Sequence, residues 1–119
     1  MSILRRYFCD TSAILKLYHN EIGSAWMEQL FKDQSIDLVI SELTTIEVAS
    51  ALARRLRRGD ISSRAYQVAL DNFLQDCNRR LTLIPLTSSV AARARGLVAK
   101  YGQELANQNV GCYPVGSGS

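Results

Sequence analysis

Asp10 is the first residue of this chain whose position calls for a chemical explanation. It ends a short apolar stretch, residues 7–9, and the hydroxyls of Thr11 and Ser12 follow it directly. A carboxylate at the end of a buried strand must meet water, a cation or a hydrogen-bond donor, because burial without a partner is costly. Asp before Thr-Ser is also a common helix start. Asp10 is therefore either a metal ligand or only a helix cap.

Glu47 is the second carboxylate with an unusual setting. It falls within a predicted helix over residues 42–58, where no Lys or Arg stands three or four residues away to pair with it. If that helix follows a strand of a parallel sheet, Glu47 and Asp10 face the same sheet edge. At about 5 Å and an effective dielectric of ~20 the two charges would repel by roughly 3 kcal/mol. A hard cation, Mg²⁺ or Mn²⁺, would relieve this repulsion; the alternative is that Glu47 is simply solvated.

The densest positive charge of the sequence, "RRLRR", ends the same predicted helix. It accounts for much of the formal net charge of +3. Cations suit the negative end of the helix dipole, and Gly59 is a typical helix stop. One interpretation is therefore that the cluster is the solvated end of a helix. The other interpretation is a patch that contacts phosphates of nucleic acid. The residues concerned are Arg54, Arg55, Arg57 and Arg58.

Apolar periodicity predicts the elements that would hold these side chains. Strands are expected over residues 4–10, 35–41 and 81–86, because each is a short apolar run of β character. Helices are expected after a cap at Thr11 or Ser12, from about residue 22, over 42–58, after a cap at Asp60 or Ser62, and after a cap at Thr87. Strands separated by helices pair in parallel and carry helices on both faces, which predicts an α/β fold.

Each predicted helix has an apolar side that we expect to be buried. These stripes follow spacings of three and four residues, as in a helix that covers a sheet. The second helix carries its stripe on Trp26, Met27, Leu30 and Phe31, although this stripe is also a possible partner surface. The fourth carries it on Tyr66, Leu70, Phe73, Leu74 and Cys77, and the last on Val90, Ala94, Leu97, Val98 and Tyr101.

Length and composition limit the class of protein. The 119 residues, 47% hydrophobic and 21% charged, are those of one globular domain. No apolar run approaches the roughly 18 to 20 residues of a membrane span, and the N-terminus is too short in its apolar part for a secretory signal, so we expect a cytoplasmic protein.

Cys9, Cys77 and Cys112 form no Cys-x-x-Cys pair, and we expect reduced thiols. We predict a domain over residues 1–102 and an irregular tail over 103–119, which ends in Gly and Ser.

Three segments in order carry a resemblance to a known family. They are "YFCDTSAILKLYHNEIGS", "VISELTTIEVASALARRLRRGDIS" and "LTLIPLTSSVAARARGLVAKYG", and they cover nearly all of residues 4–102. Together they resemble a PIN domain, in particular the toxins of prokaryotic toxin-antitoxin pairs, the VapC type. The resemblance implies a three-layer α/β/α fold and a ribonuclease that depends on Mg²⁺ or Mn²⁺.

The resemblance also assigns roles to residues and partners to the chain. Asp10 matches the first acid of the family, Glu47 the second, in a T-x-x-E-V context, and Ser12 the hydroxyl beside the metal, with Thr11 as a further supporting residue. The implied mechanism is metal-assisted hydrolysis of a phosphodiester. RNA would approach along the arginine cluster, and an antitoxin protein and a second copy of the chain are the expected protein partners.

The sequence departs from the family pattern after residue 102. Asn107 stands near the position of the third acid, no carboxylate follows Glu104, and the last strand and helix of the family are missing or altered. We therefore expect a truncated PIN-like domain with an impaired nuclease site. The alternative is a non-catalytic PIN-like module that binds a partner or dimerises. An aspartyl phosphatase is disfavoured, because Ser12 occupies the place of its second Asp.

Overall fold

The fold is a four-stranded sheet with helices on both faces. A computed structural model describes residues 5–101 and 111–116. The strands β1 (Arg5–Cys9), β2 (Ile36–Ser41), β3 (Leu81–Ile84) and β4 (Cys112–Pro114) lie in the order β3-β2-β1-β4. The first three pair in parallel, as predicted, and β4 runs antiparallel to β1. The α/β class predicted from the sequence is confirmed.

The described residues contain five helices, and several of their ends follow capping residues of the sequence. They are α1 (Thr11–Leu15), α2 (Ser24–Lys32), α3 (Glu42–Arg58), α4 (Ser63–Arg79) and α5 (Ser88–Tyr101). Ser62 caps α4 by accepting a hydrogen bond from the backbone of Ala65, and Thr87 caps α5 by accepting one from Val90. Gly59 ends α3 with a left-handed backbone, φ 78°, which glycine adopts without steric cost.

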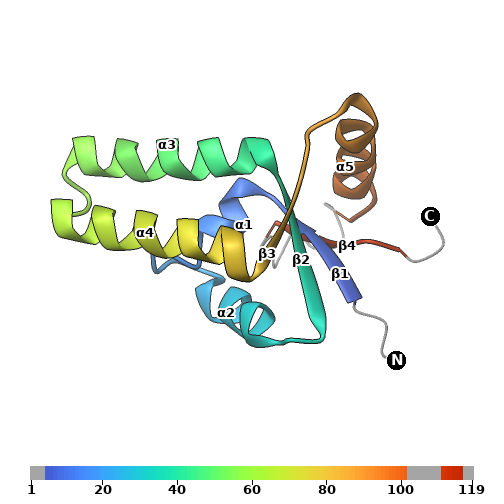
Figure 1. Cartoon of the computed structure of the whole chain (residues 1–119), viewed down its shortest axis with the longest axis horizontal. Helices are drawn as coiled ribbons and strands as arrows, with labels where there is room; N and C mark the ends of the chain where they lie inside the picture. The colour runs from blue at the N-terminus through green and yellow to red at the C-terminus, as the bar shows by residue number, and fades with distance from the viewer. Residues whose placement is uncertain (1–4, 102–110, 117–119) are drawn as a thin grey trace.

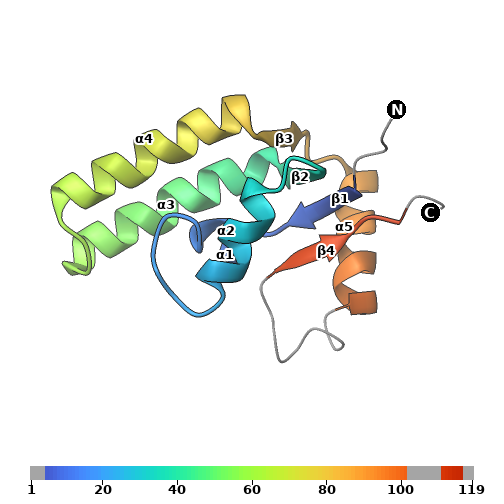
Figure 2. The same ribbon diagram turned by 90° about the horizontal axis from the view of Figure 1, so that it is seen from below.

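The helices form two layers of unequal size. Helices α1 to α4 lie on one side of the sheet, and α5 lies alone on the other (Figures 1 and 2). Helices α3 and α4 form a long antiparallel pair that extends beyond the sheet (Figure 1). None of the helices in the described part of the chain has both the length and the apolar character that a membrane span needs.

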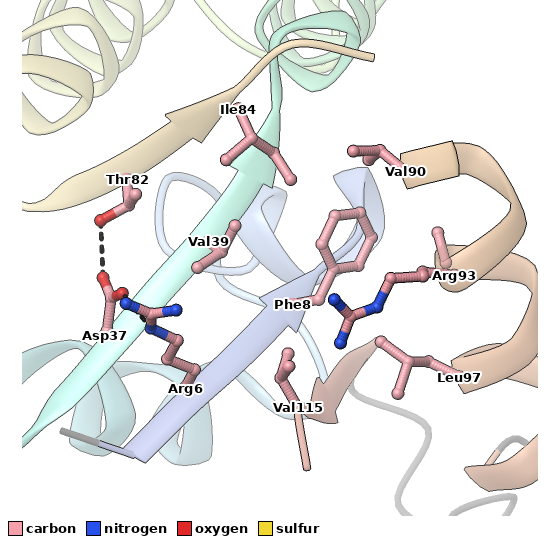
Figure 3. Close-up of a pocket in the computed structure, with 11 residues that line it drawn as sticks. Arg6, Phe8, Asp37, Val39, Thr82, Ile84, Val90, Arg93, Leu97 and Val115 are labelled. Carbon is pink, nitrogen blue, oxygen red and sulfur yellow. Dashed lines mark hydrogen bonds and ion pairs between the residues drawn. The ribbon is translucent and has the colours of Figure 1, made fainter. Parts of the chain in front are cut away.

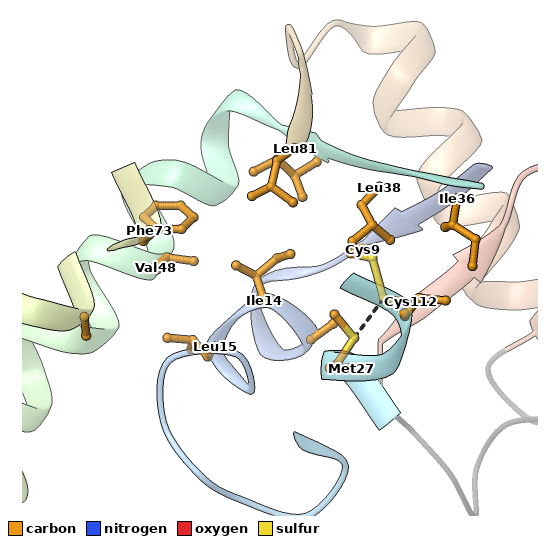
Figure 4. Packing of buried hydrophobic residues seen from close by; sticks show 14 of the residues in the cluster. Cys9, Ile14, Leu15, Met27, Ile36, Leu38, Val48, Phe73, Leu81 and Cys112 are labelled. Carbon is orange, nitrogen blue, oxygen red and sulfur yellow. Dashed lines mark hydrogen bonds between the residues drawn. A yellow bond between two sulfur atoms is a disulfide. The ribbon is translucent and has the colours of Figure 1, made fainter. Parts of the chain in front are cut away.

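Alternate residues of each strand face the two layers. Cys9 of β1, Leu38 and Ile40 of β2 and Leu81 of β3 join the hydrophobic core against α1 to α4 (Figure 4). Their neighbours in the sequence, such as Phe8 and Val39, line a cavity on the side of α5. This period of two is the geometry of a strand covered on both faces. We call the first side the core face and the second the α5 face.

Three predicted helix stripes are only partly buried. On α2, Met27 and Leu30 are buried, but Trp26 is 37% exposed, and on α4 Leu74 is half exposed. The reason is that each helix meets the sheet along a narrow stripe, which Met27 and Phe73 fill, so the apolar residues next to it face water. On α5 no residue is buried, and Val98 is exposed. The prediction of an inner face that includes Trp26, Leu74 and Val98 was wrong.

A disulfide between Cys9 and Cys112 corrects the prediction of reduced thiols. The two residues are paired opposite each other on β1 and β4, with their Cα atoms 4.2 Å apart. Both are almost fully buried, and the Sγ of Cys112 lies 3.4 Å from the Sδ of Met27 (Figure 4). Cys77 alone is a free thiol among the described residues. No Cys-x-x-Cys motif marks this pair, because its two members are 103 residues apart in the sequence and meet only through strand pairing.

Strand β4 lies in the segment for which we predicted an irregular tail. Its three residues continue the sheet beyond β1, and the backbone N–H of Val115 donates to the carbonyl of Arg6. Three residues are too few for a periodic signal in the sequence. The edge of β1 is therefore covered by a strand that the sequence pattern did not reveal.

Candidate active site

A pocket of about 350 Å³ lies at the edge of the sheet where β1 and β2 end. It is bordered by the end of β1, the start of α1, the last residue of β2 and the first two turns of α3. This is the edge at which open α/β sheets bind ligands. The lining residues are Phe8, Asp10, Thr11, Ser12, Ser41, Thr44 and Glu47. The two acids and the two hydroxyl residues predicted beside them, Thr11 and Ser12, thus line one pocket.

Asp10 is the N-cap of α1 and also lines the pocket. Its Oδ1 accepts hydrogen bonds from the backbone N–H of Ala13 at 2.9 Å and from the hydroxyl of Ser12 at 2.8 Å. Its Oδ2 accepts no hydrogen bond from any residue that the structure describes. The two interpretations of Asp10 are therefore compatible, because one oxygen caps the helix and the other is free for a ligand.

Glu47 is held in a similar way by the hydroxyl of Thr11. The Oγ1 of Thr11 donates to its Oε1 at 2.7 Å, which links the first residue of α1 to the second turn of α3. The second oxygen, Oε2, has no hydrogen bond within residues 5–101 and 111–116. No Lys or Arg of these residues forms an ion pair with Asp10 or Glu47. The negative charge of the pocket is therefore not neutralised by the described side chains.

Ser41 and Thr44 form the wall of the pocket beside Glu47. Ser41 is the last residue of β2 and the N-cap of α3, and its Oγ accepts a hydrogen bond from the backbone of Thr44 at 3.4 Å. Because α3 starts at the very end of β2, Glu47 is brought back toward the sheet edge after about one and a half turns. We did not select Ser41 or Thr44 from the sequence, although a Ser before a helix is a recognisable cap.

A buried cation supports the start of α1 from behind. The Nζ of Lys16 donates to the carbonyl of Ser12 at 3.1 Å and lies 3.6 Å from Glu21, which also pairs with Arg55 at 3.4 Å. Lys16 is buried while Glu21 is exposed, so the cation is held from the protein side and its hydrogen bond to Ser12 supports the turn that carries this residue. The sequence showed Lys16 only as a polar residue on an apolar helix.

The arginine cluster lies apart from the pocket. Arg54, Arg57 and Arg58 are exposed at the far end of α3, about 10–17 Å along the helix from Glu47 at 1.5 Å per residue. Arg55 is half-buried and engaged with Glu21. The structure therefore brings the two acids together but leaves the arginines at the opposite end of their helix.

Gly111 and Tyr113 approach Asp10 from β4 and could not be found from the sequence. The carbonyl of Gly111 accepts a hydrogen bond from the backbone N–H of Asp10 at 2.8 Å. Gly111 has φ 80°, and a Cβ at this position would overlap the Asp10 carboxylate, so glycine alone fits without a shift. Burial, and then the negative charge of Asp10, raise the pKa of the Tyr113 phenol above its usual value.

The acidic site consists of two carboxylates in the described part of the chain. No group of three or more His, Cys, Asp or Glu side chains that could hold a metal occurs among the described residues. Asn107, which the resemblance placed near a third acid, lies outside the described residues. Two carboxylates with free oxygens suit Mg²⁺ or Mn²⁺, which keep several waters and use only one or two protein carboxylates with substrate phosphate. The donors present therefore fit such an ion.

A family comparison agrees with this arrangement. The model of the PIN domain family matches residues 7–111, most of the chain. The match includes both acids, and it runs past residue 102, where we had predicted the end of the domain. PIN domains are in general nucleases, generally use divalent metal ions and typically bind RNA. None of the curated proteins compared with the chain matches it.

Proposed function

The chain belongs to the PIN domain family, and we propose that it is a ribonuclease that depends on Mg²⁺ or Mn²⁺ and cuts phosphodiester bonds at the pocket of Asp10 and Glu47. One observation supports this function most directly. Two carboxylates line one open pocket, each has one oxygen fixed by α1 and one oxygen free, and no described cation neutralises them. Such a pocket attracts a divalent cation.

Asp10 Oδ2 and Glu47 Oε2 would hold the metal ion. When bound, such an ion polarises a phosphate and lowers the pKa of a water that can attack it. The residues of the chain prepare the donors. The hydroxyl of Ser12 and the backbone of Ala13 orient Asp10, and the hydroxyl of Thr11 orients Glu47. These hydrogen bonds restrict the rotamers of both carboxylates, so each free oxygen is already oriented for a ligand.

RNA contacts would extend beyond the pocket. The exposed Arg54, Arg57 and Arg58 would bind phosphates at a distance from the cut bond, with Arg55 as the fourth member already paired to Glu21. Contacts of this kind add affinity and carry no base specificity. We propose that the activity is that of a VapC-type toxin in the cytoplasm, restrained by an antitoxin protein, and that the active form is a homodimer.

The alternative function is a PIN-like module without catalysis. The observation in its favour is that only two acids line the pocket among the described residues, so the negative charge that would fix an ion is small. In this case the chain would bind a protein partner or a second copy with the pocket idle. The two functions differ in metal binding and RNA cleavage.

Metal binding and RNA cleavage of four variants test the proposal. Asp10→Asn keeps a good N-cap and removes the negative charge. Glu47→Gln removes the negative charge of the second acid, on α3. Glu42→Gln is the matched control, because Glu42 is exposed on the same helix and does not line the pocket. We expect Mn²⁺-dependent cleavage by the wild type and Glu42→Gln, and none by the two site variants. Thr11→Val should reduce activity by about 10–100-fold, since it frees Glu47 from its hydrogen bond.

Two outcomes would decide against a nuclease. The first is absence of Mn²⁺ binding by calorimetry at millimolar ion, and the second is cleavage that persists equally in Asp10→Asn. Asn107→Asp separates an impaired site from an absent one. Activity that rises in this variant and still requires Asp10 indicates a nuclease with an incomplete acidic set, whereas inactivity of every variant favours the partner-binding module.

A further inference from the structure

A second cavity lies on the α5 face and is chemically unlike the acidic pocket. It encloses about 320 Å³ between the sheet and α5 (Figure 3). Most of its lining is apolar, and the size falls in the range of small-molecule sites. The apolar side chains come from all three parallel strands, from α5 and from the residue after β4: Phe8, Val39, Ile84, Val90, Leu97 and Val115.

Among the described residues, the charges around this cavity leave Arg93 without an acidic partner. Asp37 pairs through Oδ2 with Arg6 at 3.3 Å and accepts a hydrogen bond on Oδ1 from Thr82 at 2.6 Å. Arg93 of α5 has no acidic partner within residues 5–101 and 111–116. Its guanidinium extends from α5 toward β1 beside the ring of Phe8 (Figure 3). The charges of Arg6 and Asp37 cancel, so Arg93 leaves the described lining with one net positive charge.

The packing of α5 shows that the cavity is not filled by the helix. No residue of α5 is buried, whereas α3 buries Val48 and Leu52 in the core. The sheet beneath α5 is apolar at Phe8, Val39 and Ile84, and Val39 is buried there. A ligand with an apolar body would therefore gain contact with both Phe8 of the sheet and Leu97 of α5, and displace water from both.

We propose that this cavity binds a small organic monocarboxylate with an apolar body, such as an arylalkyl or medium-chain acid. The carboxylate would accept paired hydrogen bonds from the guanidinium of Arg93, a geometry in which Arg is well suited to carboxylates. The apolar body would lie between Phe8 and Leu97. The single unpaired cation of the described lining, Arg93, matches one negative charge. A nucleotide phosphate fits less well, because its second charge would meet Asp37 rather than a second free cation.

This site is separate from the nuclease pocket, although Phe8 borders both. None of the acids proposed to hold the metal lines it. Binding of the carboxylate is thus expected whether or not the chain cleaves RNA, and the proposal does not depend on the proposed function.

Binding of 4-phenylbutanoate to the full chain tests the proposal. The titration is followed by calorimetry and by ¹H–¹⁵N NMR, with 4-phenylbutanamide, acetate and uridine monophosphate as comparison probes. We expect saturable binding of 4-phenylbutanoate, with shifts at Val39 and Val90, and at least roughly tenfold weaker binding of the amide, which lacks the charge. Acetate should not bind, since it lacks the apolar body.

Variants on α5, which contributes no buried residue to the core, locate the site without disturbing the core. Arg93→Gln should weaken 4-phenylbutanoate by roughly tenfold, while Arg95→Gln, two residues away and outside the cavity, should leave it unchanged. Ala94→Phe should fill the cavity and abolish binding, and Ala92→Phe is its control. Folding of each variant is checked by its thermal midpoint.

Several results would overturn the proposal. These are absence of 4-phenylbutanoate binding at millimolar concentration, equal binding of the amide, or binding that Arg93→Gln and Ala94→Phe leave intact. Tighter binding of uridine monophosphate than of 4-phenylbutanoate, lost in Arg93→Gln, would instead assign the cavity to nucleic acid.

Discussion

The two faces of the sheet are packed to different degrees by residues that alternate along the same strands. On the core face, Leu38 and Ile40 meet Ile14, Met27 and other fully buried side chains of α1 to α4 (Figure 4). On the α5 face, the neighbouring residues line a cavity, and the covering helix buries nothing. A close-packed layer supplies stability, whereas a loosely covered one leaves room for a ligand.

The difference also explains how the acidic pocket can be rigid at an open edge. Its two acids are held by α1 and α3, and both helices belong to the core face. Groups placed on packed elements keep their geometry better than groups on loops. Stability is therefore expected to depend on the core face, and ligand binding on the pocket and the α5 face.

The largest effect is expected from Phe73→Ala. Phe73 is fully buried on α4 and packs edge-on against Tyr18, with ring centroids 5.5 Å apart. Its loss should lower the free energy of unfolding by about 3–5 kcal/mol, through lost contacts and the cavity left behind. Phe8→Ala on the α5 face should cost only about 1–2 kcal/mol, because Phe8 already borders open space. Urea unfolding measures both, and equal costs would show that the two faces are packed alike.

The next largest effect is expected from Cys112→Ala. The disulfide closes a separation of 103 residues and ties β4 to the core face beside Met27. Its loss should cost about 2–4 kcal/mol. Cys77→Ala is the control, since Cys77 is a free, half-buried thiol.

Reduction of the wild type with a dithiol should reproduce the cost of Cys112→Ala. If unfolding of the wild type in urea is the same with and without reductant, β4 is not held by the disulfide. The core face would then be complete without it.

Tyr18→Phe should have an intermediate effect that depends on pH. Burial, and then the hydrogen bond to Asp76 at 2.6 Å, raise the pKa of Tyr18 far above its usual value of 10. Above about pH 10 the unfolded chain loses a proton that the folded chain keeps, so the contribution of Tyr18 to stability is constant below this pH and falls as the pH rises further.

The measurement for Tyr18 is urea unfolding at several pH values between 8 and 11. At pH 8 the variant should be less stable by about 1–2 kcal/mol, because Asp76 loses its donor. Above pH 10 the wild type should lose stability more steeply than Tyr18→Phe. Parallel slopes would mean that the phenol titrates normally and is not enclosed by the core face.

The smallest effect is expected from Val90→Ala on α5. Val90 lines the cavity without being buried, so its truncation should cost about 0.5 kcal/mol or less. Val48→Ala is the matched change on the core face, where Val48 is fully buried on α3, and it should cost clearly more. A cost for Val90 equal to that for Val48 would contradict the open α5 face.

Local patterns in the sequence were sufficient for the order of the elements from β1 to α5, and they drew attention to the two acids. Asp10 ends an apolar run, Glu47 lacks a cation within one turn, and Ser62 and Thr87 cap helices, and each of these signals lies within a few residues of chain. Periodicity was less reliable for side chains at the border of a helix stripe, as Trp26 and Val98 show. It indicates which side of a helix is apolar but not how much of that side its neighbours cover.

By itself the sequence determined the α/β class, the caps of α4 and α5, and the positions of Asp10 at the end of a strand and of Glu47 inside a helix, because hydrophobic period and capping chemistry are local. Tertiary structure alone decided that Cys112 pairs with Cys9, that Gly111 lies against Asp10, and that Arg93 faces an apolar cavity. These contacts join residues more than 80 positions apart, and they exist only once β4 and α5 are placed against β1. Nothing in the local pattern of either partner specifies the other.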